Sequence, residues 1–145
     1  NVNGVINTIR ATMAGMKARG YGRIVNIASN AAIGTALPGT TFYAATKAEV
    51  LILTKRFALE LGRSGITVNA VCPGWIVTDM TRGSTTEEEF SARVADMGER
   101  TMVGRVGAPE DIAAAVAFLA SPEAGFTTAQ VLTVDGGRKD YIGHG

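Results

Sequence analysis

Cysteine and histidine are almost absent from this sequence of 145 residues, which contains one of each. A single cysteine, Cys72, forms no internal disulfide bond. With His144 as the only histidine, the chain also has too few of the ligands that zinc prefers. We therefore predict no metal site and a reducing, cytoplasmic setting.

Long apolar runs and an excess of charge are missing as well. The longest apolar stretches, 50–53 and 113–120, are much shorter than the roughly 20 residues that span a bilayer. The 14 Lys and Arg nearly balance the 13 Asp and Glu, and no basic stripe is interleaved with aromatic residues. We therefore expect neither a membrane segment nor nucleic-acid binding. A hydrophobic fraction of 46% is typical of a soluble globular protein with one core.

Helical and strand patterns alternate along the chain. Apolar residues at helical spacing predict helices over 2–17, 41–62 and 109–120, and apolar, β-branched runs predict buried strands over 24–28, 65–72 and 130–134. The chain begins without an initiator methionine and its helical pattern starts almost at once, so we expect a piece that starts within a fold. The residues after Gly137 are expected to form a polar tail.

The middle of the chain has the order strand, long helix, strand. This order predicts a right-handed βαβ unit within a parallel sheet. The segment 81–107 differs in composition: the run 84–89 offers the spacing of a capping box, and Phe90, Val94 and Met97 predict a short helix with a thin apolar edge. We expect this segment to be a mobile insert and a candidate substrate lid.

A tyrosine and a lysine four residues apart, Tyr43 and Lys47, open the long central helix. Residues at this spacing share one face of a helix. A cation on that face stabilises the phenolate form of the tyrosine, which makes Tyr43 a candidate general acid/base. The pair alone is also compatible with an ordinary surface turn, so the interpretation depends on its surroundings.

Those surroundings are two strand ends. Ser29 follows the strand 24–28, and Pro73-Gly74 follows the strand 65–72. Ligands of open α/β sheets bind outside the carboxyl ends of the strands, where both groups are expected to lie. A serine hydroxyl there is suited to hold a substrate oxygen by a hydrogen bond.

In this order, the motifs resemble the short-chain dehydrogenases/reductases, specifically the compact subtype that includes the 3-oxoacyl-carrier-protein reductases. The resemblance runs from Asn1 to Gly137. It implies four catalytic residues: Asn1, Ser29, Tyr43 and Lys47. Asn3 is the competitor of Asn1 for the role of the catalytic Asn. It also implies cofactor contacts from Tyr43, Lys47, Pro73, Gly74, Ile76 and Thr78.

The resemblance implies a fold and an activity. The expected fold is the carboxyl-terminal part of a Rossmann-type, doubly wound parallel sheet in three α/β/α layers, with residues 1–145 as part of one domain. The expected activity is that of an oxidoreductase that uses NADP or NAD to interconvert a ketone and a secondary alcohol, first of all as a ketoreductase for 3-oxoacyl thioesters. The expected partners are a small carbonyl or alcohol substrate and further copies of the chain, in a homodimer or homotetramer.

Several alternatives remain at this point. The family's amino-terminal half, with its glycine-rich phosphate turn, has no counterpart here, which leaves open a truncated or degenerate, catalytically silent structural module. An epimerase or dehydratase on the same fold ranks lower. The spacing from Ser29 to Tyr43 is one residue longer than is common in the family. We assign the extra residue to the loop 34–41, which is expected to border the substrate. Single residues also have structural alternatives. Ser29 could cap a turn, Asn69 could serve as a structural hydrogen-bonding residue, and Cys72 could be a buried core thiol.

Overall fold

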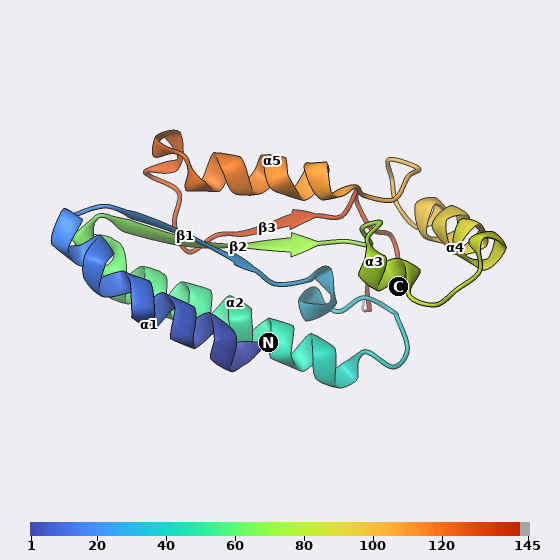
Figure 1. Cartoon of the computed structure of the whole chain (residues 1–145), viewed down its shortest axis with the longest axis horizontal. Helices are drawn as coiled ribbons and strands as arrows, with labels where there is room; N and C mark the ends of the chain where they lie inside the picture. Colours follow the sequence, from blue (N-terminus) through green and yellow to red (C-terminus); the bar gives the residue numbers. More distant parts are fainter. Residues whose placement is uncertain (143–145) are drawn as a thin grey trace.

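A parallel sheet of three strands forms the centre of the molecule (Figure 1). The computed structural model describes residues 1–142, so His144 lies outside the described part. In chain order the helices and strands are α1 (Val2–Arg19), β1 (Gly22–Ile27), α2 (Thr41–Leu61), β2 (Ile66–Pro73), α3 (Asp79–Arg82), α4 (Glu87–Glu99), α5 (Pro109–Ala120) and β3 (Val131–Val134). Three short 3-10 turns, η1 (Asn30–Ile33), η2 (Gly62–Ser64) and η3 (Pro122–Ala124), complete the order.

The layers confirm the predicted α/β architecture. The strands pair in the order β1-β2-β3, with α1 and α2 on one face of the sheet and α5 on the other (Figure 1). Gly22 is opposite Ile66 in the first pair and Ala70 is opposite Val131 in the second, and both pairs are parallel. All three strands therefore end on the same side of the molecule, where ligands are expected.

Helix ends follow the residues that favour them. The predicted helix 109–120 has the same bounds in α5, with a proline in its first turn and acidic residues after it. α1 stops at Gly20, whose φ of 64° lies in the left-handed region that glycine tolerates. α4 begins with a capping box between Thr86 and Glu89, which is one of the pairs that the predicted spacing in 84–89 allows.

The core lies between the sheet and the helices α1 and α2. One buried cluster packs α1 and α2 against the start of β2, through Ile9, Ala58, Leu61, Ile66 and Val68. A second cluster lies under the carboxyl ends of the strands and consists of Ala28, Val50 and Cys72. The second cluster thus supports the part of the sheet on which Ser29 and Pro73 are placed.

Burial differs among the strands more than the sequence suggests. In β2, seven of the eight residues are buried, from Ile66 to Cys72. β1 and β3, which were also predicted to be buried, are mostly half-buried. Within residues 1–142 each of them has a paired neighbour on one side only, so the prediction of three buried strands is wrong for these two.

Residues 138–142 do not form a polar tail, contrary to the expectation from the sequence. Arg138 forms an isolated antiparallel bridge with Thr101, and Tyr141 forms another with Thr35. The Ala36 amide donates to the Asp140 carbonyl at 2.8 Å. The segment is therefore fixed between the base of the predicted lid and the loop that joins Ser29 to Tyr43.

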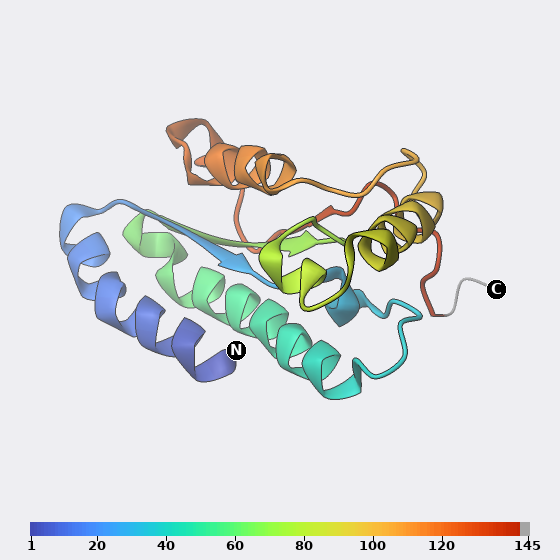
Figure 2. The ribbon, with the colours of Figure 1, turned by 45° about the vertical axis from the view of Figure 1, so that its right-hand side comes forward.

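The predicted lid lies beyond the ends of the strands. Figures 1 and 2 both place α3 and α4 on the side toward which the strands point. Helix α4 has a thin apolar edge, as predicted, with Phe90 and Met97 buried. None of the helices in the described part is both long enough and apolar enough to cross a membrane.

Candidate active site

A cleft of about 460 Å³ opens at the carboxyl ends of β1 and β2. Its walls come from the end of β1, the start of α2, the segment after β2, and the first turn of α5. Seven of its lining residues were predicted from the sequence as catalytic or cofactor-binding: Ser29, Tyr43, Lys47, Pro73, Gly74, Ile76 and Thr78. Groups that are up to 49 residues apart in sequence, from Ser29 to Thr78, therefore meet in one place.

Tyr43 and Lys47 lie in the first two turns of α2 and face the cleft together. The Lys47 Nζ donates a hydrogen bond to the Ile27 carbonyl oxygen at 3.0 Å and lies 5.8 Å from the centroid of the Tyr43 ring. The bond to β1 fixes the ammonium in place. The ammonium and the phenol are thereby presented to the same cleft.

Ser29 has two functions in the structure. As the cap of η1, its Oγ accepts a hydrogen bond from the Ala31 amide at 3.1 Å, so the turn-capping alternative is confirmed. Ser29 also lines the cleft beside Tyr43. Because Oγ acts as an acceptor for the cap, its proton remains available for a substrate oxygen.

Pro73 and Gly74 form the wall opposite α2. The backbone at Gly74 passes so close to β3 that an added Cβ would lie 2.6 Å from the Asp135 Cβ. The Gly74 amide donates to the Val134 carbonyl at 2.9 Å. Only glycine allows this approach, which joins the end of β2 to the end of β3.

The segment after Gly74 is held by α3 and by the turn before α5. Thr78 caps α3, with a reciprocal pair of hydrogen bonds to Thr81 at 2.9 and 3.3 Å. The Val77 amide donates to the Gly107 carbonyl at 2.9 Å. These bonds leave Ile76 and Thr78 at the cleft wall, where the resemblance places a cofactor contact.

Asn1 is the predicted site residue that does not line the cleft. Its Nδ2 donates to the Thr46 Oγ1 at 3.2 Å, one residue before Lys47. The Thr46 hydroxyl in turn donates to the Tyr43 carbonyl at 2.8 Å. Asn1 therefore contacts α2 between the two catalytic candidates without touching either side chain.

Two other residues behave as their structural alternatives predicted. Asn69 is fully buried, and its amide bonds the Thr127 carbonyl and the Gln130 amide at 2.9 and 3.1 Å. Cys72 is fully buried too, and this burial raises the pKa of its thiol. A raised pKa disfavours the nucleophilic thiolate, so Cys72 is a core residue.

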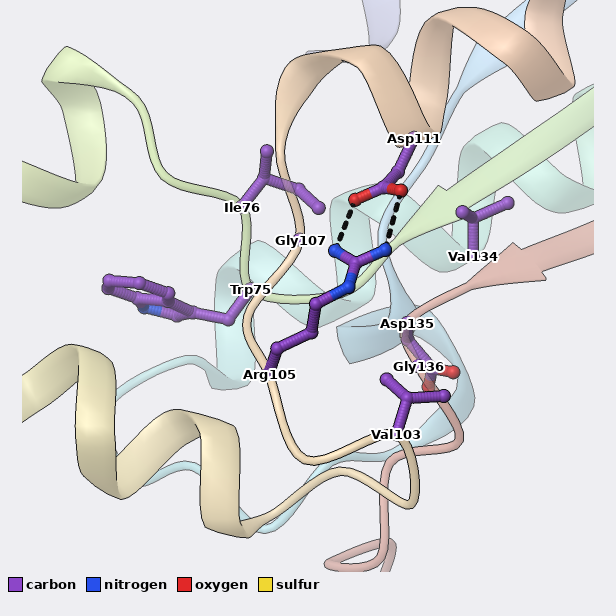
Figure 3. Close-up of a pocket in the computed structure, with 9 residues that line it drawn as sticks. All are labelled: Trp75, Ile76, Val103, Arg105, Gly107, Asp111, Val134, Asp135 and Gly136. Carbon is purple, nitrogen blue, oxygen red and sulfur yellow. Dashed lines mark hydrogen bonds and ion pairs between the residues drawn. The ribbon is translucent and has the colours of Figure 1, made fainter.

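A separate cavity of about 190 Å³ lies behind the wall that contains Ile76 (Figure 3). Arg105 and Asp111 cross it as a bidentate ion pair, with distances of 2.7 and 2.8 Å. This pair, together with the hydrogen bond from the Ala108 amide, holds the pKa of Asp111 well below its usual range. Because the pair fixes the start of α5, we assign this cavity a structural role.

Some lining residues of the cleft are not predictable from the sequence. Met80 and Thr81 contribute from α3, and Pro109 and Ile112 contribute from α5. No local motif marks these positions, because they reach the cleft only through the packing of segments that lie after β2. Within residues 1–142, no three His, Cys, Asp or Glu side chains form a group that would hold a metal ion.

Comparison with known proteins decides the family. The profile of a family described as enoyl-(acyl carrier protein) reductase matches residues 1–139. The chain belongs to the short-chain dehydrogenase/reductase family. The resemblance inferred from Ser29, Tyr43 and Lys47 is thereby confirmed at the level of the family.

Curated members of the short-chain dehydrogenase/reductase family match almost all of this chain. An acetoacetyl-CoA reductase of Rhizobium meliloti is 44% identical over 139 residues, which are 95% of this chain and 55% of that protein. The 3-oxoacyl-[acyl-carrier-protein] reductase FabG of Vibrio cholerae is 42% identical over 138 residues, which are 94% of this chain and 54% of that protein. The chain thus spans about half the length of these relatives.

Solved structures of the family show the same fold. A 3-oxoacyl-[acyl-carrier protein] reductase from Brucella melitensis matches with a TM-score of 0.85 and 38% identity, over 96% of this chain and 50% of that one. A gluconate 5-dehydrogenase from Burkholderia cenocepacia, in complex with NADP and tartrate, matches with a TM-score of 0.84 and 37% identity, over 94% of this chain and 52% of that one. The three-layer fold is therefore the Rossmann-type fold of this family.

Proposed function

We propose that this chain forms the catalytic part of an NAD(P)-dependent oxidoreductase that interconverts a ketone and a secondary alcohol. The observation that supports the proposal is the meeting of Ser29, Tyr43 and Lys47 with Pro73-Gly74 in one cleft. In the direction of reduction, a ketone, a reduced nicotinamide and a proton give a secondary alcohol and an oxidised nicotinamide.

A nicotinamide fits the chemistry of this cleft. The wall formed by Pro73, Gly74 and Ile76 is mainly apolar and approaches β3 closely, while Thr78 and Lys47 offer hydrogen-bonding groups. These residues and Tyr43 would hold the cofactor. When it is bound, the cofactor supplies or accepts a hydride at the substrate carbon.

The chain's own residues handle the proton. Tyr43 gives its phenolic proton to the substrate oxygen in reduction and takes it back in oxidation. Lys47, fixed by its bond to Ile27, stabilises the phenolate that remains. Ser29 donates a hydrogen bond from its hydroxyl to the same substrate oxygen and orients it. Asn1, through its contact with Thr46, is our candidate for the outer end of a water-mediated relay toward Lys47.

The finer assignments belong to the same proposal. Relatives named acetoacetyl-CoA reductase and 3-oxoacyl-[acyl-carrier-protein] reductase make a 3-oxoacyl thioester the first substrate to try. The neighbour in complex with NADP makes NADPH the first cofactor, with NADH as the alternative. We further propose a cytoplasmic homotetramer and a substrate lid formed by residues 81–107, which begin at the cleft wall.

Replacing Tyr43 by Phe tests the proposal in the full-length protein. We expect kcat for the reduction of acetoacetyl-CoA with NADPH to fall by about 10²- to 10⁴-fold, because the proton donor is lost while the ring remains. The measurement is the absorbance of NADPH at saturating substrate. Tyr21→Phe is the matched control, since Tyr21 contacts Arg23 away from the cleft. Unchanged turnover in Tyr43→Phe would refute the assignment.

A second candidate is a catalytically silent structural module. It is favoured by a cavity of about 440 Å³ between α1 and β1, on the side of β1 that has no paired strand. An exposed strand edge of this kind invites association. If the native full-length protein neither binds NADPH or NADH nor reduces any carbonyl compound, this candidate replaces the enzyme.

A further inference from the structure

A second, smaller cavity of about 160 Å³ adjoins the cleft. Four residues line both spaces: Ser29, Tyr43, Gly74 and Thr81. A substrate oxygen held by Ser29 and Tyr43 therefore lies at the junction of the two spaces. With the cofactor in the larger cleft, the smaller cavity receives the remainder of the substrate.

The small cavity has a mixed polar and apolar lining that includes a buried cation. Three threonines, Thr35, Thr40 and Thr81, line it together with Asn30 and Arg138. The side chain of Arg138 is only 4% exposed. Its Nε and Nη2 bond Asp140, whereas Nη1 makes no hydrogen bond to the residues that the structure describes. Asn30, a residue that is 6% exposed, also lines the cavity and is hydrogen-bonded to Tyr141.

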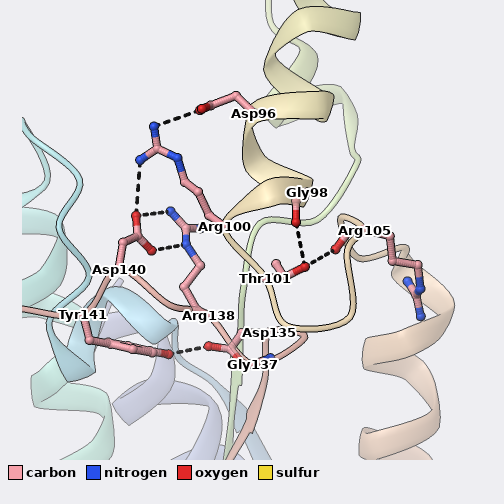
Figure 4. Close-up of polar contacts among 10 residues, drawn as sticks. All are labelled: Asp96, Gly98, Arg100, Thr101, Arg105, Asp135, Gly137, Arg138, Asp140 and Tyr141. Carbon is pink, nitrogen blue, oxygen red and sulfur yellow. Dashed lines mark hydrogen bonds and ion pairs between the residues drawn. The ribbon is translucent and has the colours of Figure 1, made fainter. Parts of the chain in front are cut away.

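A chain of ion pairs sets the charge beside this cavity (Figure 4). Asp140 lies between Arg138 and Arg100, and Arg100 continues to Asp96 at 2.9 Å. The two guanidinium groups hold the pKa of Asp140 below its usual range, so Asp140 stays ionised. The inner three groups carry a net charge of +1, and Asp96, which balances it, is more than half exposed at the outer end. The nearest further carboxylate, Asp135, accepts the Tyr141 hydroxyl and the Gly137 amide and does not line the cavity.

The backbone fixes Arg138 in this place. Arg138 forms the bridge with Thr101 at the base of the lid segment, and the next amide, of Lys139, donates to the Arg100 carbonyl at 2.9 Å. On the other side, the Ile142 amide donates to the Gly34 carbonyl at 2.7 Å. A cation that is fixed and desolvated in this way loses little entropy when it binds an anion.

We propose that Arg138 recognises a carboxylate on the substrate, so that the enzyme acts on short oxo acids and their hydroxy acids. The inference rests on the proposed oxidoreductase function, and it replaces the 3-oxoacyl thioester, the first substrate suggested by the relatives, with a free oxo acid. A cavity of 160 Å³ corresponds to about five water molecules, which suits a carboxylate with two or three carbons. Arg138 would bind it by a charge-assisted hydrogen bond from Nη1.

The test compares two substrates that differ in one charge, acetoacetate and methyl acetoacetate. In the native full-length protein we expect kcat/KM to favour the acid. In Arg138→Met we expect kcat/KM for the acid to fall about 10- to 100-fold and that for the ester to stay within about threefold. Arg105→Met is the matched control, because it also breaks a bidentate ion pair but at the other cavity.

Two additions keep the test decisive. Arg138→Met leaves Asp140 without its nearest partner and can therefore impair folding. The double variant Arg138→Met/Asp140→Asn removes both charges, so it tests the site even if the single variant does not fold. Trp75, the only tryptophan, lines the small cavity and reports acetoacetate binding by fluorescence without any turnover.

The outcomes separate the two proposals. If the native protein reduces the acid and the ester equally well, or if the variants bind acetoacetate as tightly as the native protein, the carboxylate site is wrong while the proposed function stands. If acetoacetate binds in a manner that depends on Arg138 but no carbonyl compound is reduced with NADPH or NADH, the anion site stands and the proposed function fails.

Discussion

Gly65, between α2 and β2, occupies a position where no side chain fits. Its φ of 74° lies in the left-handed region, and an added Cβ would collide with the Gly20 carbonyl oxygen. This contact joins the turn after α1 to the turn before β2. It therefore fixes where β1 and β2 begin.

The substitution Gly65→Ala should lower the free energy of unfolding by about 2–4 kcal/mol, because it adds left-handed strain to a backbone clash. Gly62→Ala is the control: Gly62 is helical, with φ of −56°, and an added Cβ there meets nothing within 4 Å. We expect this control to stabilise the protein by about 0.5 kcal/mol. Urea unfolding measures both, and equal effects of the two substitutions would contradict the argument.

Among single residues, those close in sequence to a recognisable motif were predictable and the others were not. Ser29, Tyr43 and Lys47 belong to one strand end and one helix start, so their spacing alone places them together. Arg138 follows the last strand by four residues, and only the bridge to Thr101 turns it toward the cleft. Its contact depends on tertiary packing, for which the sequence contains no local signal.

At the scale of elements, the start of α5 depends on one carboxylate. Asp111 accepts the Ala108 amide at 2.8 Å and pairs with Arg105. Because its pKa in the folded protein lies below the unfolded value of about 4, its contribution to stability is present above that pH and is lost as the pH falls through the folded pKa.

Asp111→Asn should accordingly lower the unfolding midpoint in urea at pH 7, and the difference from the native protein should shrink at a pH well below 4. Circular dichroism across the two pH ranges measures this. The control is Glu110→Gln, since Glu110 is exposed and forms no ion pair within residues 1–142. A difference that persists unchanged in acid would show that the capping carboxylate is not the cause.

The bounds of a helix were predictable where the sequence contains both residues that favour a helix start and residues that end a helix. The helix 109–120 was predicted with its observed bounds because a proline, two acids and a second proline enclose it. The partial burial of β1 and β3 was not predicted, because an apolar strand has the same sequence pattern at the centre and at the edge of a sheet. Position within a sheet is a property of the pairing order.

At the scale of the molecule, α2 exposes an apolar stripe away from the sheet. Ile52 and Leu59 are 59% and 72% exposed, and they lie two helical turns apart on the same face. Together with the exposed Phe42 they form a surface that suits a second copy of the helix. The self-association that we propose would use this stripe.

The double variant Ile52→Glu/Leu59→Glu should therefore shift the full-length protein to a smaller assembly, because each copy adds two negative charges to the shared surface. Light scattering coupled to size-exclusion chromatography gives the mass. Met102→Glu, at a residue that is 77% exposed outside the helical layer, is the control. A native protein that is already monomeric would exclude this interface.

The two cavities that meet at Ser29 and Tyr43 belong to different parts of the chain. Ser29, Tyr43 and Lys47 come from the end of β1 and the start of α2, whereas the small cavity takes most of its remaining wall from the loop 30–40 between them and from Arg138. We expect substitutions in that loop and at Arg138 to change which substrates are accepted, and to leave intact the proton transfer that we propose. Such a division would let new substrates arise by gradual change at the rim of an unchanged catalytic unit.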